Sequence, residues 1–340
     1  MQDLFLDDRI FPTAIRIDAS TVCQLKCPLC PRTTGETSKT LGNGFLKFDD
    51  FRNLVDANPQ IKMIEFGNFG EVFLNPEFSE ILRYASENSI ETSIDEGANL
   101  NDASNEVLEA LIKYQTKVVR CAIDGASQSS YEKYRVGGRL VDVINNIKKI
   151  NSFKEKYSSD KPDLIFQFVL FDHNKHELEY ARLLSKMLKM SFYIKLNFNS
   201  RTMQPSDKEI VRKYAGFSDR KEYLQKTGRH YQRVLCYDMW MSPQVNWDGR
   251  LIGCTRNIWG DYSVNVFRDG LQNSLNSEKI LHNRRILMGK TPSTEDIPCL
   301  NCGNFKNMKN TGDWISTDEI SEYIVNSSSG MLGNHSEKSH

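Results

Sequence analysis

Three cysteines lie four and three residues apart near the start of the chain, as Cys23, Cys27 and Cys30. They directly follow a short apolar run, residues 14–19, that is typical of a buried strand. Thiolates at this spacing can ligate three irons of a cubane cluster and leave the fourth iron without a protein ligand. An open iron can bind a chelating substrate, so the spacing predicts the centre of an enzyme.

The alternative for this loop is a structural zinc site. Zinc prefers four closed ligands in paired spacing, and no fourth ligand lies close to these three cysteines in the sequence. The spacing therefore favours an iron–sulfur cluster.

The composition is that of a soluble globular protein. The 340 residues, 39% of them hydrophobic and 26% charged, suffice for one large core and a smaller appended unit. Since 44 basic residues balance 44 acidic ones, we expect neither nucleic acid nor a membrane surface as a partner. The acidic N-terminus resembles no secretory signal, and the apolar runs are too short to span a bilayer. We therefore expect a cytoplasmic protein, in which eight cysteines are metal ligands or catalytic thiols before they are disulfides.

Short apolar runs alternate with longer amphipathic stretches over residues 13–200. The runs predict strands and the stretches predict helices, and this order is typical of a parallel sheet that is closed or partly closed into a barrel. The expected strands lie at residues 14–19, 63–66, 91–94, 118–123, 164–170 and 192–198, and the clearest helices at 76–88, 102–114, 140–157 and 175–190.

From residue 201 onward the alternation of apolar runs and amphipathic stretches ends. Residues 201–235 are rich in Lys, Arg, Gln and Ser and predict a linker or an active-site cover. Beyond them, Asp248-Gly249 separates two short strand-like pieces and predicts a hairpin. We expect an N-terminal extension (1–12), a partial barrel (13–200), the linker or cover (201–235), a small C-terminal domain (236–312), and a C-terminal helix with a disordered tail (313–340).

Four further cysteines fall in that small C-terminal domain. Four scattered thiols suit either a closed iron–sulfur cluster or a structural zinc ion, and spacing alone does not decide between them. The eighth cysteine, Cys121, lies in the middle of an expected strand, where we expect a small core residue. The four candidate ligands are Cys236, Cys254, Cys299 and Cys302.

The cysteine loop and the segments after later strands together resemble the radical S-adenosylmethionine enzymes. The loop matches their C-x-x-x-C-x-x-C motif, and residues 67–76 are similar to their G-x-x-G-E-P-L-L-N-P stretch. The resemblance covers most of residues 13–312 and implies a partial (β/α)6 TIM-like barrel. It also implies that a carboxylate and a glycine-opened backbone meet the methionine ammonium, as charge pairing requires. The cofactor-binding residues that it implies are Leu29, Gly70, Glu71, Asp124, Arg135 and Asn174.

The chain departs from the family pattern at three places. Leu29 replaces a frequent aromatic residue, so an apolar contact to adenine remains without stacking. Ala122 replaces a serine, and Asp-Glu-Gly at residues 95–97 replaces Thr-Asn-Gly. We expect the ribose and carboxylate contacts to be partly rerouted.

The region from Cys236 onward resembles the auxiliary-cluster domain called SPASM or, in its shorter form, twitch. The full form has seven cysteines for two clusters, whereas this chain has no cysteine after Cys302. The resemblance therefore implies one auxiliary [4Fe–4S] cluster on all four cysteines, with no open iron. With the S-adenosylmethionine-binding cluster, two [4Fe–4S] clusters are expected.

The resemblance implies reductive cleavage of S-adenosylmethionine to a 5′-deoxyadenosyl radical, with a flavodoxin- or ferredoxin-type protein as the electron donor. A closed second cluster then implies an electron acceptor. We expect oxidation, that is dehydrogenation, of a small hydroxylated or amino-sugar-like metabolite. Such an oxidation needs a base, for which Arg201, Tyr237 and Asp238 are candidates.

Two alternatives remain open. One is a maturase that crosslinks, epimerises or oxidises a precursor peptide; only 22 residues precede Cys23, too few for a folded leader-binding module. The other is a non-catalytic iron–sulfur or zinc protein. Glu71 and Arg135 argue against it, because a binding module has no use for a methionine clamp.

Overall fold

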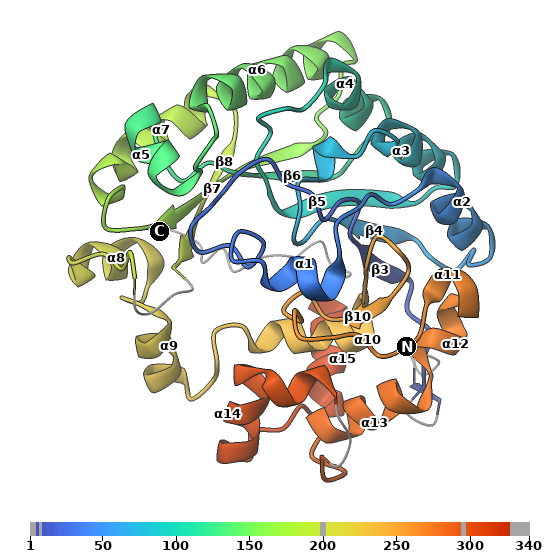
Figure 1. Ribbon diagram of the computed structural model, residues 1–340. Coiled ribbons are helices and arrows are strands. Elements are labelled where there is room, and N and C mark those ends of the chain that lie inside the picture. Colours follow the sequence, from blue (N-terminus) through green and yellow to red (C-terminus); the bar gives the residue numbers. More distant parts are fainter. Residues whose placement is uncertain (1–4, 7–8, 198–201, 294–296, 327–340) are drawn as a thin grey trace.

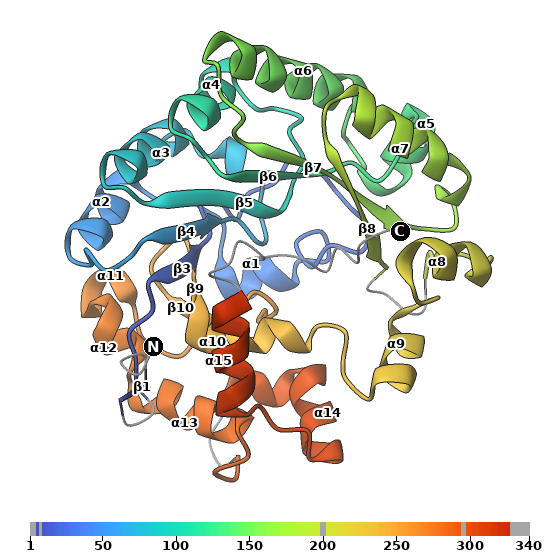
Figure 2. The ribbon, with the colours of Figure 1, turned by 180° about the vertical axis from the view of Figure 1, so that it is seen from behind.

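The computed structural model describes residues 5–6, 9–197, 202–293 and 297–326 of the chain. Six parallel strands follow one another around a curved sheet, and helices cover its outer face (Figures 1 and 2). This arrangement confirms the predicted partial TIM-like barrel. The six strands are β3 (Ala14–Ile17), β4 (Met63–Phe66), β5 (Glu91–Ala98), β6 (Val118–Ala122), β7 (Asp163–Leu170) and β8 (Ser191–Leu196).

The outer helices are amphipathic and begin at polar capping residues or at turns. Ser104, for example, accepts a hydrogen bond of 3.2 Å from the backbone nitrogen of Val107 and so starts one helix. The four helices expected from the sequence are present with slightly narrower bounds. The outer layer comprises α2 (Phe48–Asp56), α3 (Phe78–Glu87), α4 (Asn105–Lys113), α6 (Leu140–Lys156) and α7 (Leu178–Met187), the last preceded by η3 (Lys175–Glu177).

Two shorter helices belong to the loops that leave the carboxyl ends of the strands. They are α1 (Glu36–Leu41), after β3, and α5 (Gln128–Tyr134), after β6. In Figure 1, α1 lies in front of the sheet. Because the carboxyl ends of the barrel strands share one face, these loops are brought together there.

Side chains along each strand alternate between the two faces of the sheet. Ile15 and Ile17 point outward into the core beneath the helices. Several inward positions are polar: Arg16 is in register with Glu65, and Gln167 with Tyr193. A TIM barrel usually fills its interior with branched apolar side chains. This barrel instead has an interior lined with hydrogen-bonding groups, which we call the lumen.

The predicted hairpin is present, with β9 (Gln244–Val245) antiparallel to β10 (Leu251–Gly253). Gly249 in its turn has a φ of +85°, which glycine adopts readily. The hairpin also extends the barrel sheet, because β9 pairs in parallel with β3. Sequence reasoning did not predict this pairing. The sheet order is β10-β9-β3-β4-β5-β6-β7-β8, so among the described residues β8 and β10 form its two edges.

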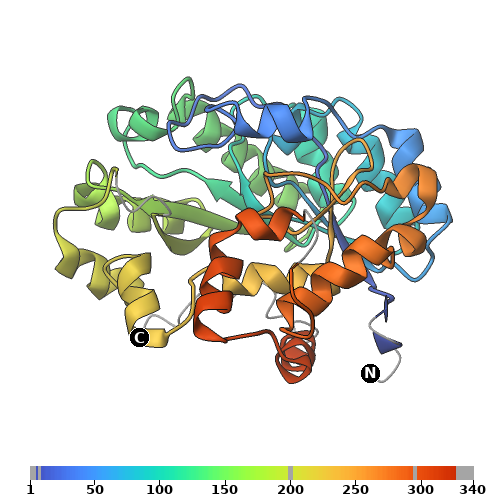
Figure 3. The same ribbon diagram turned by 60° about the horizontal axis from the view of Figure 1, so that its bottom comes forward.

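The segment that we predicted as a linker or cover forms α8 (Lys208–Ala215) and α9 (Arg220–Thr227). The C-terminal segment, orange to red, then gathers on one side of the barrel (Figure 3). Its last helix, α15 (Thr317–Asn326), lies in front in Figure 2 and thus at the end of the barrel opposite to α1. The intervening elements are η4 (Arg233–Tyr237), α10 (Asp238–Met241), α11 (Val266–Asp269), α12 (Leu271–Leu275), α13 (Glu278–Leu287), η5 (Pro298–Asn301) and α14 (Gly303–Thr311).

At the N-terminus, β1 (Phe5–Leu6) and β2 (Arg9–Ile10) form a separate small hairpin. The tail that we predicted to be disordered lies largely outside the described residues, which end at residue 326. No helix in the described part of the chain is long and apolar enough to cross a membrane.

Candidate active site

The first cysteine loop lies between β3 and α1, at the carboxyl end of the strand. The backbone nitrogen of Cys30 donates to the carbonyl oxygen of Cys27 at 3.0 Å, which closes a turn between the two thiols. Cys27 is buried, whereas Cys23 and Cys30 are partly exposed. Apolar side chains from three other loops and strands surround them, and the predicted adenine contact Leu29 packs among these. The apolar group comprises Leu25, Leu29, Tyr134, Val169, Phe171 and Met203.

Two polar side chains reach the sulfur atoms of this loop. The guanidinium of Arg135 approaches Cys27 Sγ at 3.7 Å, and the Asn99 amide approaches Cys23 Sγ at 3.7 Å. Burial raises the pKa of Cys23 to about 12 and also raises that of Cys27. The thiols therefore need a positive partner to ionise, and iron provides one.

Glu71 lies beside this loop, and within the described part of the chain only one of its two carboxylate oxygens has a hydrogen-bond partner. Oε2 accepts a hydrogen bond of 2.7 Å from the backbone nitrogen of Asn99. Oε1 is buried and has no hydrogen-bond partner among the described residues. Burial raises the pKa of the Glu71 carboxyl to about 7. A buried acceptor without a donor is costly, so the site fits a ligand that brings an N–H donor, such as an ammonium.

Gly70 brings the loop after β4 against the loop after β3. A Cβ atom at this position would clash with the backbone carbonyl of Ser20. The next residue, Glu71, donates its backbone N–H to the carbonyl of Val22 at 2.8 Å. Only glycine allows this approach, so Gly70 sets the distance between Glu71 and the cysteines.

Arg135, Asp124 and Asn174 form one connected group. Arg135 ends α5 and donates from Nε to Asp124 Oδ2 at 2.8 Å. The other oxygen of Asp124 accepts from the backbone nitrogen of Val169 at 2.6 Å. Asn174 is fully buried, and its amide donates to the carbonyls of Asp124 and Val169 at 2.9 Å each and accepts from the backbone nitrogen of Phe171. These bonds hold the loops after β6 and β7, and direct contact of Asp124 or Asn174 with a cofactor stays a prediction.

The second cysteine set is brought together from three separate segments of the chain, the last of which carries both Cys299 and Cys302. Its members lie in η4, after β10, in η5 and at the start of α14. In the described part of the chain, no three His, Cys, Asp or Glu side chains converge on one point as the ligands of a single metal ion do. All four predicted ligands line one hollow that is otherwise mostly apolar. They are Cys236, Cys254, Cys299 and Cys302.

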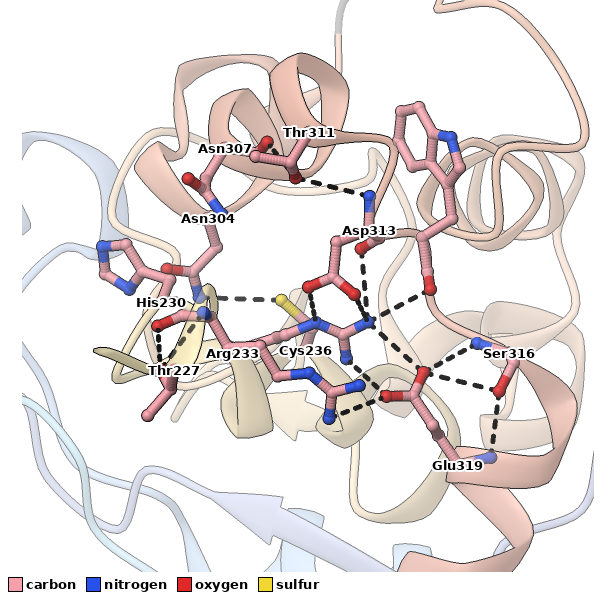
Figure 4. Close-up of polar contacts among 12 residues, drawn as sticks. Thr227, His230, Arg233, Cys236, Asn304, Asn307, Thr311, Asp313, Ser316 and Glu319 are labelled. Carbon is pink, nitrogen blue, oxygen red and sulfur yellow. Dashed lines mark hydrogen bonds and ion pairs between the residues drawn. The ribbon is translucent and has the colours of Figure 1, made fainter. Parts of the chain in front are cut away.

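Two polar side chains also lie close to sulfur atoms of this second cysteine set. The Asn304 amide donates to Cys236 Sγ at 3.7 Å (Figure 4), and the hydroxyl of Tyr262 lies 3.7 Å from Cys299 Sγ. Burial raises the pKa of Cys236 and Cys254. As at the first loop, the residues fit a cationic metal centre bound by thiolates.

The three candidate bases lie in different surroundings in the structure. Arg201 lies outside the described residues. Tyr237 accepts a hydrogen bond of 2.9 Å from Arg233, on the side of α15. Asp238 is buried and ion-paired to Arg16 at 3.6 Å, so it faces the lumen. Of the three, Asp238 is therefore the one that the described residues place at the lumen, and its role as a base stays a prediction.

Sequence reasoning missed the charged residues that line the lumen. Arg16 pairs with Glu96 at 2.7 Å, and Arg120 pairs with Asp95 at 2.8 Å. Period-two alternation within the predicted strands carried this signal, since the polar positions are the inward ones. Cys121, on the opposite face of β6 from Arg120, is fully buried in the core, as predicted.

No family model matches the sequence. The chain is 24% identical over 260 residues to the tungsten-containing aldehyde ferredoxin oxidoreductase cofactor-modifying protein of Pyrococcus furiosus, covering 71% of this chain and 70% of that protein. Two solved structures share the fold. SuiB of Streptococcus suis bound to S-adenosylmethionine has a TM-score of 0.61 at 14% identity, with 87% of this chain and 72% of SuiB covered. The structure of anSMEcpe with bound AdoMet has a TM-score of 0.55 at 12% identity, with 87% and 88% covered.

Proposed function

We propose that this chain, which has the fold of the radical S-adenosylmethionine enzymes, binds a [4Fe–4S] cluster through Cys23, Cys27 and Cys30 and cleaves S-adenosylmethionine there. The observation that carries the proposal is that Oε1 of Glu71, beside a loop of three thiols, is buried without a hydrogen-bond partner among the described residues. In this proposal Glu71 is the acceptor for an ammonium and the three thiols are the ligands for iron, all in loops at the carboxyl end of the barrel strands.

The residues around the first cysteine loop each have a role in this proposal. Glu71 accepts from the methionine ammonium, and Gly70 keeps its loop close enough to do so. Leu29 and the apolar group around it exclude water from the adenine side. Arg135, already held by Asp124, carries a positive charge beside Cys27 and the predicted methionine carboxylate. When bound, the cluster and S-adenosylmethionine supply a 5′-deoxyadenosyl radical that removes a hydrogen atom from the substrate.

We further propose that the four C-terminal cysteines hold a closed auxiliary [4Fe–4S] cluster that accepts an electron. The common hollow of the four thiols, the donor from Asn304 and the contact of the Tyr262 hydroxyl with Cys299 Sγ support this assignment. Dehydrogenation then balances: the substrate gives a hydrogen atom to the radical, a proton to a base and one electron to the auxiliary site. Asp238 is the base that we favour, and a flavodoxin- or ferredoxin-type protein returns electrons to the first cluster.

The polar lumen supports a hydroxylated or amino-bearing small molecule as substrate, because its strands present charged and amide side chains inward. Modification of a peptide is the second candidate. It is favoured by the structure of SuiB bound to the precursor peptide SuiA, which has a TM-score of 0.60 to this chain. The Pyrococcus relative carries the name of a cofactor-modifying protein, which agrees with a small-molecule substrate.

The decisive experiment is anaerobic reconstitution followed by turnover with dithionite. We expect about eight irons and eight sulfides per chain, four for each cluster, and formation of 5′-deoxyadenosine, detected by mass spectrometry. Replacing Cys23, Cys27 and Cys30 together with Ala removes about four irons and abolishes 5′-deoxyadenosine formation.

Cys121→Ala is the matched control, because Cys121 is a buried core cysteine and should leave both the iron content and the cleavage in place. Cleavage that persists in the triple variant contradicts the assignment of the open iron. Four irons with one zinc ion per chain contradicts the auxiliary cluster.

A further inference from the structure

The charged groups of the lumen are unevenly paired. On the side of β3 to β6, each arginine faces a carboxylate: Arg16 meets Glu96, and Arg120 meets Asp95. On the side of β8 and α9, Arg220 forms no ion pair with any described carboxylate. Positive charge that is withdrawn from water without a partner is unusual, because its desolvation goes uncompensated.

Arg220 is held in place by neutral groups. Its Nη2 donates to the carbonyl of Leu196 at 3.1 Å, and its guanidinium lies 4.6 Å from the ring centre of Tyr231. Its Nε is buried without a hydrogen-bond partner among the described residues. Burial, with repulsion from Arg256, lowers the pKa of Arg220 to about 10. The side chain is thus held in place, and its Nε–H remains available to donate to a ligand.

Two further cations extend this site in opposite directions. Lys195 is in register with Val169, which packs in the apolar group around the first cysteine loop. Within the described part of the chain, Lys195 has no hydrogen bond or ion pair, and burial together with Arg220 lowers its pKa. Arg256 lines the hollow of the second cysteine set, and its Nε is also buried without a partner among the described residues.

The titratable groups around these cations do not supply a free anion among the described residues. His230 faces both arginines and has its pKa lowered to about 4 by burial and by Arg256 and Arg220, so the imidazole is neutral at pH 7 and does not compensate their charge. Glu96 attracts Lys195 but is bonded to Arg16. Arg256 also lies close to the second set of thiols, whereas Lys195 and Arg220 do not line their hollow.

We propose that Lys195, Arg220 and Arg256 bind an anionic group of the substrate, a carboxylate or a phosphate, and thereby hold the substrate between the two cysteine sites. The inference rests on the proposed function for the identity of the substrate site. Guanidinium groups bind carboxylate and phosphate through paired N–H donors, and a lysine adds a compact charge. The row from Lys195 to Arg256 leads from the first cysteine loop to the second set, so an anion here places the rest of the molecule along the electron path.

The test uses the full-length, cluster-loaded protein under anaerobic conditions. Sodium phosphate and sodium acetate are titrated separately at constant ionic strength set with sodium chloride, and the midpoint of thermal unfolding is recorded. We expect a saturable rise with at least one of the two anions. Phosphate acting at lower concentration indicates a phosphorylated substrate, and acetate acting at lower concentration indicates a carboxylate.

Variants then locate the binding. We expect Arg220→Gln and Lys195→Gln each to weaken the apparent anion affinity about tenfold, while Arg220→Lys, which keeps the charge, weakens it less. Lys221→Gln, on the same helix but exposed, is the matched control and should bind as the wild type does. Iron content confirms that each variant retains its clusters.

The inference is overturned if neither anion exceeds chloride, or if Arg220→Gln titrates like the wild type. Formation of 5′-deoxyadenosine by the wild type is measured separately. Saturable anion binding without 5′-deoxyadenosine contradicts only the proposed function, and 5′-deoxyadenosine without anion binding contradicts only this inference.

Discussion

At the scale of single residues, the sulfur atoms of the second cysteine set differ in the donors that reach them. Asn304 is buried on α14 and spans two partners, donating to Cys236 Sγ at 3.7 Å and to the carbonyl of Gln232 at 2.7 Å. Hydrogen bonds to a cluster thiolate stabilise the reduced, more negative state and raise the reduction potential. One amide on α14 therefore contributes to how readily the proposed auxiliary cluster accepts an electron.

Asn304→Leu, which nearly preserves the volume and removes the donor, should lower the reduction potential of the auxiliary cluster. We expect a shift of about 60 mV, since one electron at this potential difference corresponds to about 1.4 kcal/mol, the size of a hydrogen bond to a charged group. Redox titration followed by electron paramagnetic resonance measures the shift. Asn310→Leu, exposed on the same helix, is the control. An unchanged potential with an intact iron content would show that Asn304 donates nothing to the sulfur.

At the scale of elements, α15 is joined to the segment before Cys236 by one buried arginine (Figure 4). Arg233 donates from Nε to Asp313 Oδ2 at 3.0 Å and from Nη2 to the carbonyl of Trp314 at 3.1 Å. It also pairs with Glu319 of α15 at 3.2 Å. The side chain of Arg233 is only 5% exposed, whereas that of Arg229, which meets the same Glu319, is 54% exposed.

Arg233 and Arg229 are a buried and an exposed partner of the same carboxylate, so their contributions to stability can be compared directly. Arg233→Gln should lower the free energy of unfolding by about 3 kcal/mol, because it leaves Asp313 and Glu319 without their buried cation. Arg229→Gln should change it by less than about 1 kcal/mol, as exposed ion pairs do. Denaturation monitored by circular dichroism measures both, and limited proteolysis near residues 313–317 reports release of α15. Equal effects of the two substitutions would contradict this account.

The strand and helix order of the barrel was predictable, because apolar periodicity is a local signal that each segment carries by itself. The two helices within residues 201–235 also left signals that we did not use. Asp207 and Asp219 cap their starts, and Gly216 and Gly228, with positive φ, follow their ends. The pairing of β9 with β3 had no such signal, since it joins two short strands about 230 residues apart and depends on the assembled barrel.

The residues of the candidate site likewise include some that local sequence signals predicted and some that depend on the assembled fold. The three cysteines were predicted from their spacing within one loop, and Gly70 and Glu71 from the resemblance of a second short motif, in the loop after β4, to that of a known family. The structure adds Asn99 and Asn304, whose amides meet sulfur atoms only after distant segments come together. An asparagine has no distinctive sequence context for such a contact, so sequence reasoning could not separate these two from the other asparagines of the chain.

At the scale of the whole molecule, the formal net charge of zero counts every carboxyl group as ionised. Some of these carboxyl groups are buried inside the barrel, where ionisation is less favourable. Asp18, which follows β3, is fully buried and accepts from the backbone nitrogen of Phe69 at 3.4 Å and from Gln244 Nε2 at 3.0 Å. Burial raises its pKa from 3.8 to about 7. Burial also raises the pKa of Glu65, on the next strand. These acids couple folding to proton uptake.

The direction of that coupling follows from the two states of Asp18. Between pH 4 and pH 7 the folded protein keeps a proton that the unfolded chain releases, so the stability contributed by the protonated carboxyl is lost as the pH rises. From pH 5.5 to pH 8 the loss from Asp18 is about 2 kcal/mol, at 1.36 kcal/mol for each pKa unit crossed. Asp18→Asn, which keeps an acceptor and cannot ionise, should therefore lose about 2 kcal/mol less than the wild type over this range. Denaturation curves at both pH values test this, with Asp160→Asn, an exposed carboxyl, as the control; parallel pH profiles for Asp18→Asn and wild type would show that Asp18 is ionised in the folded protein.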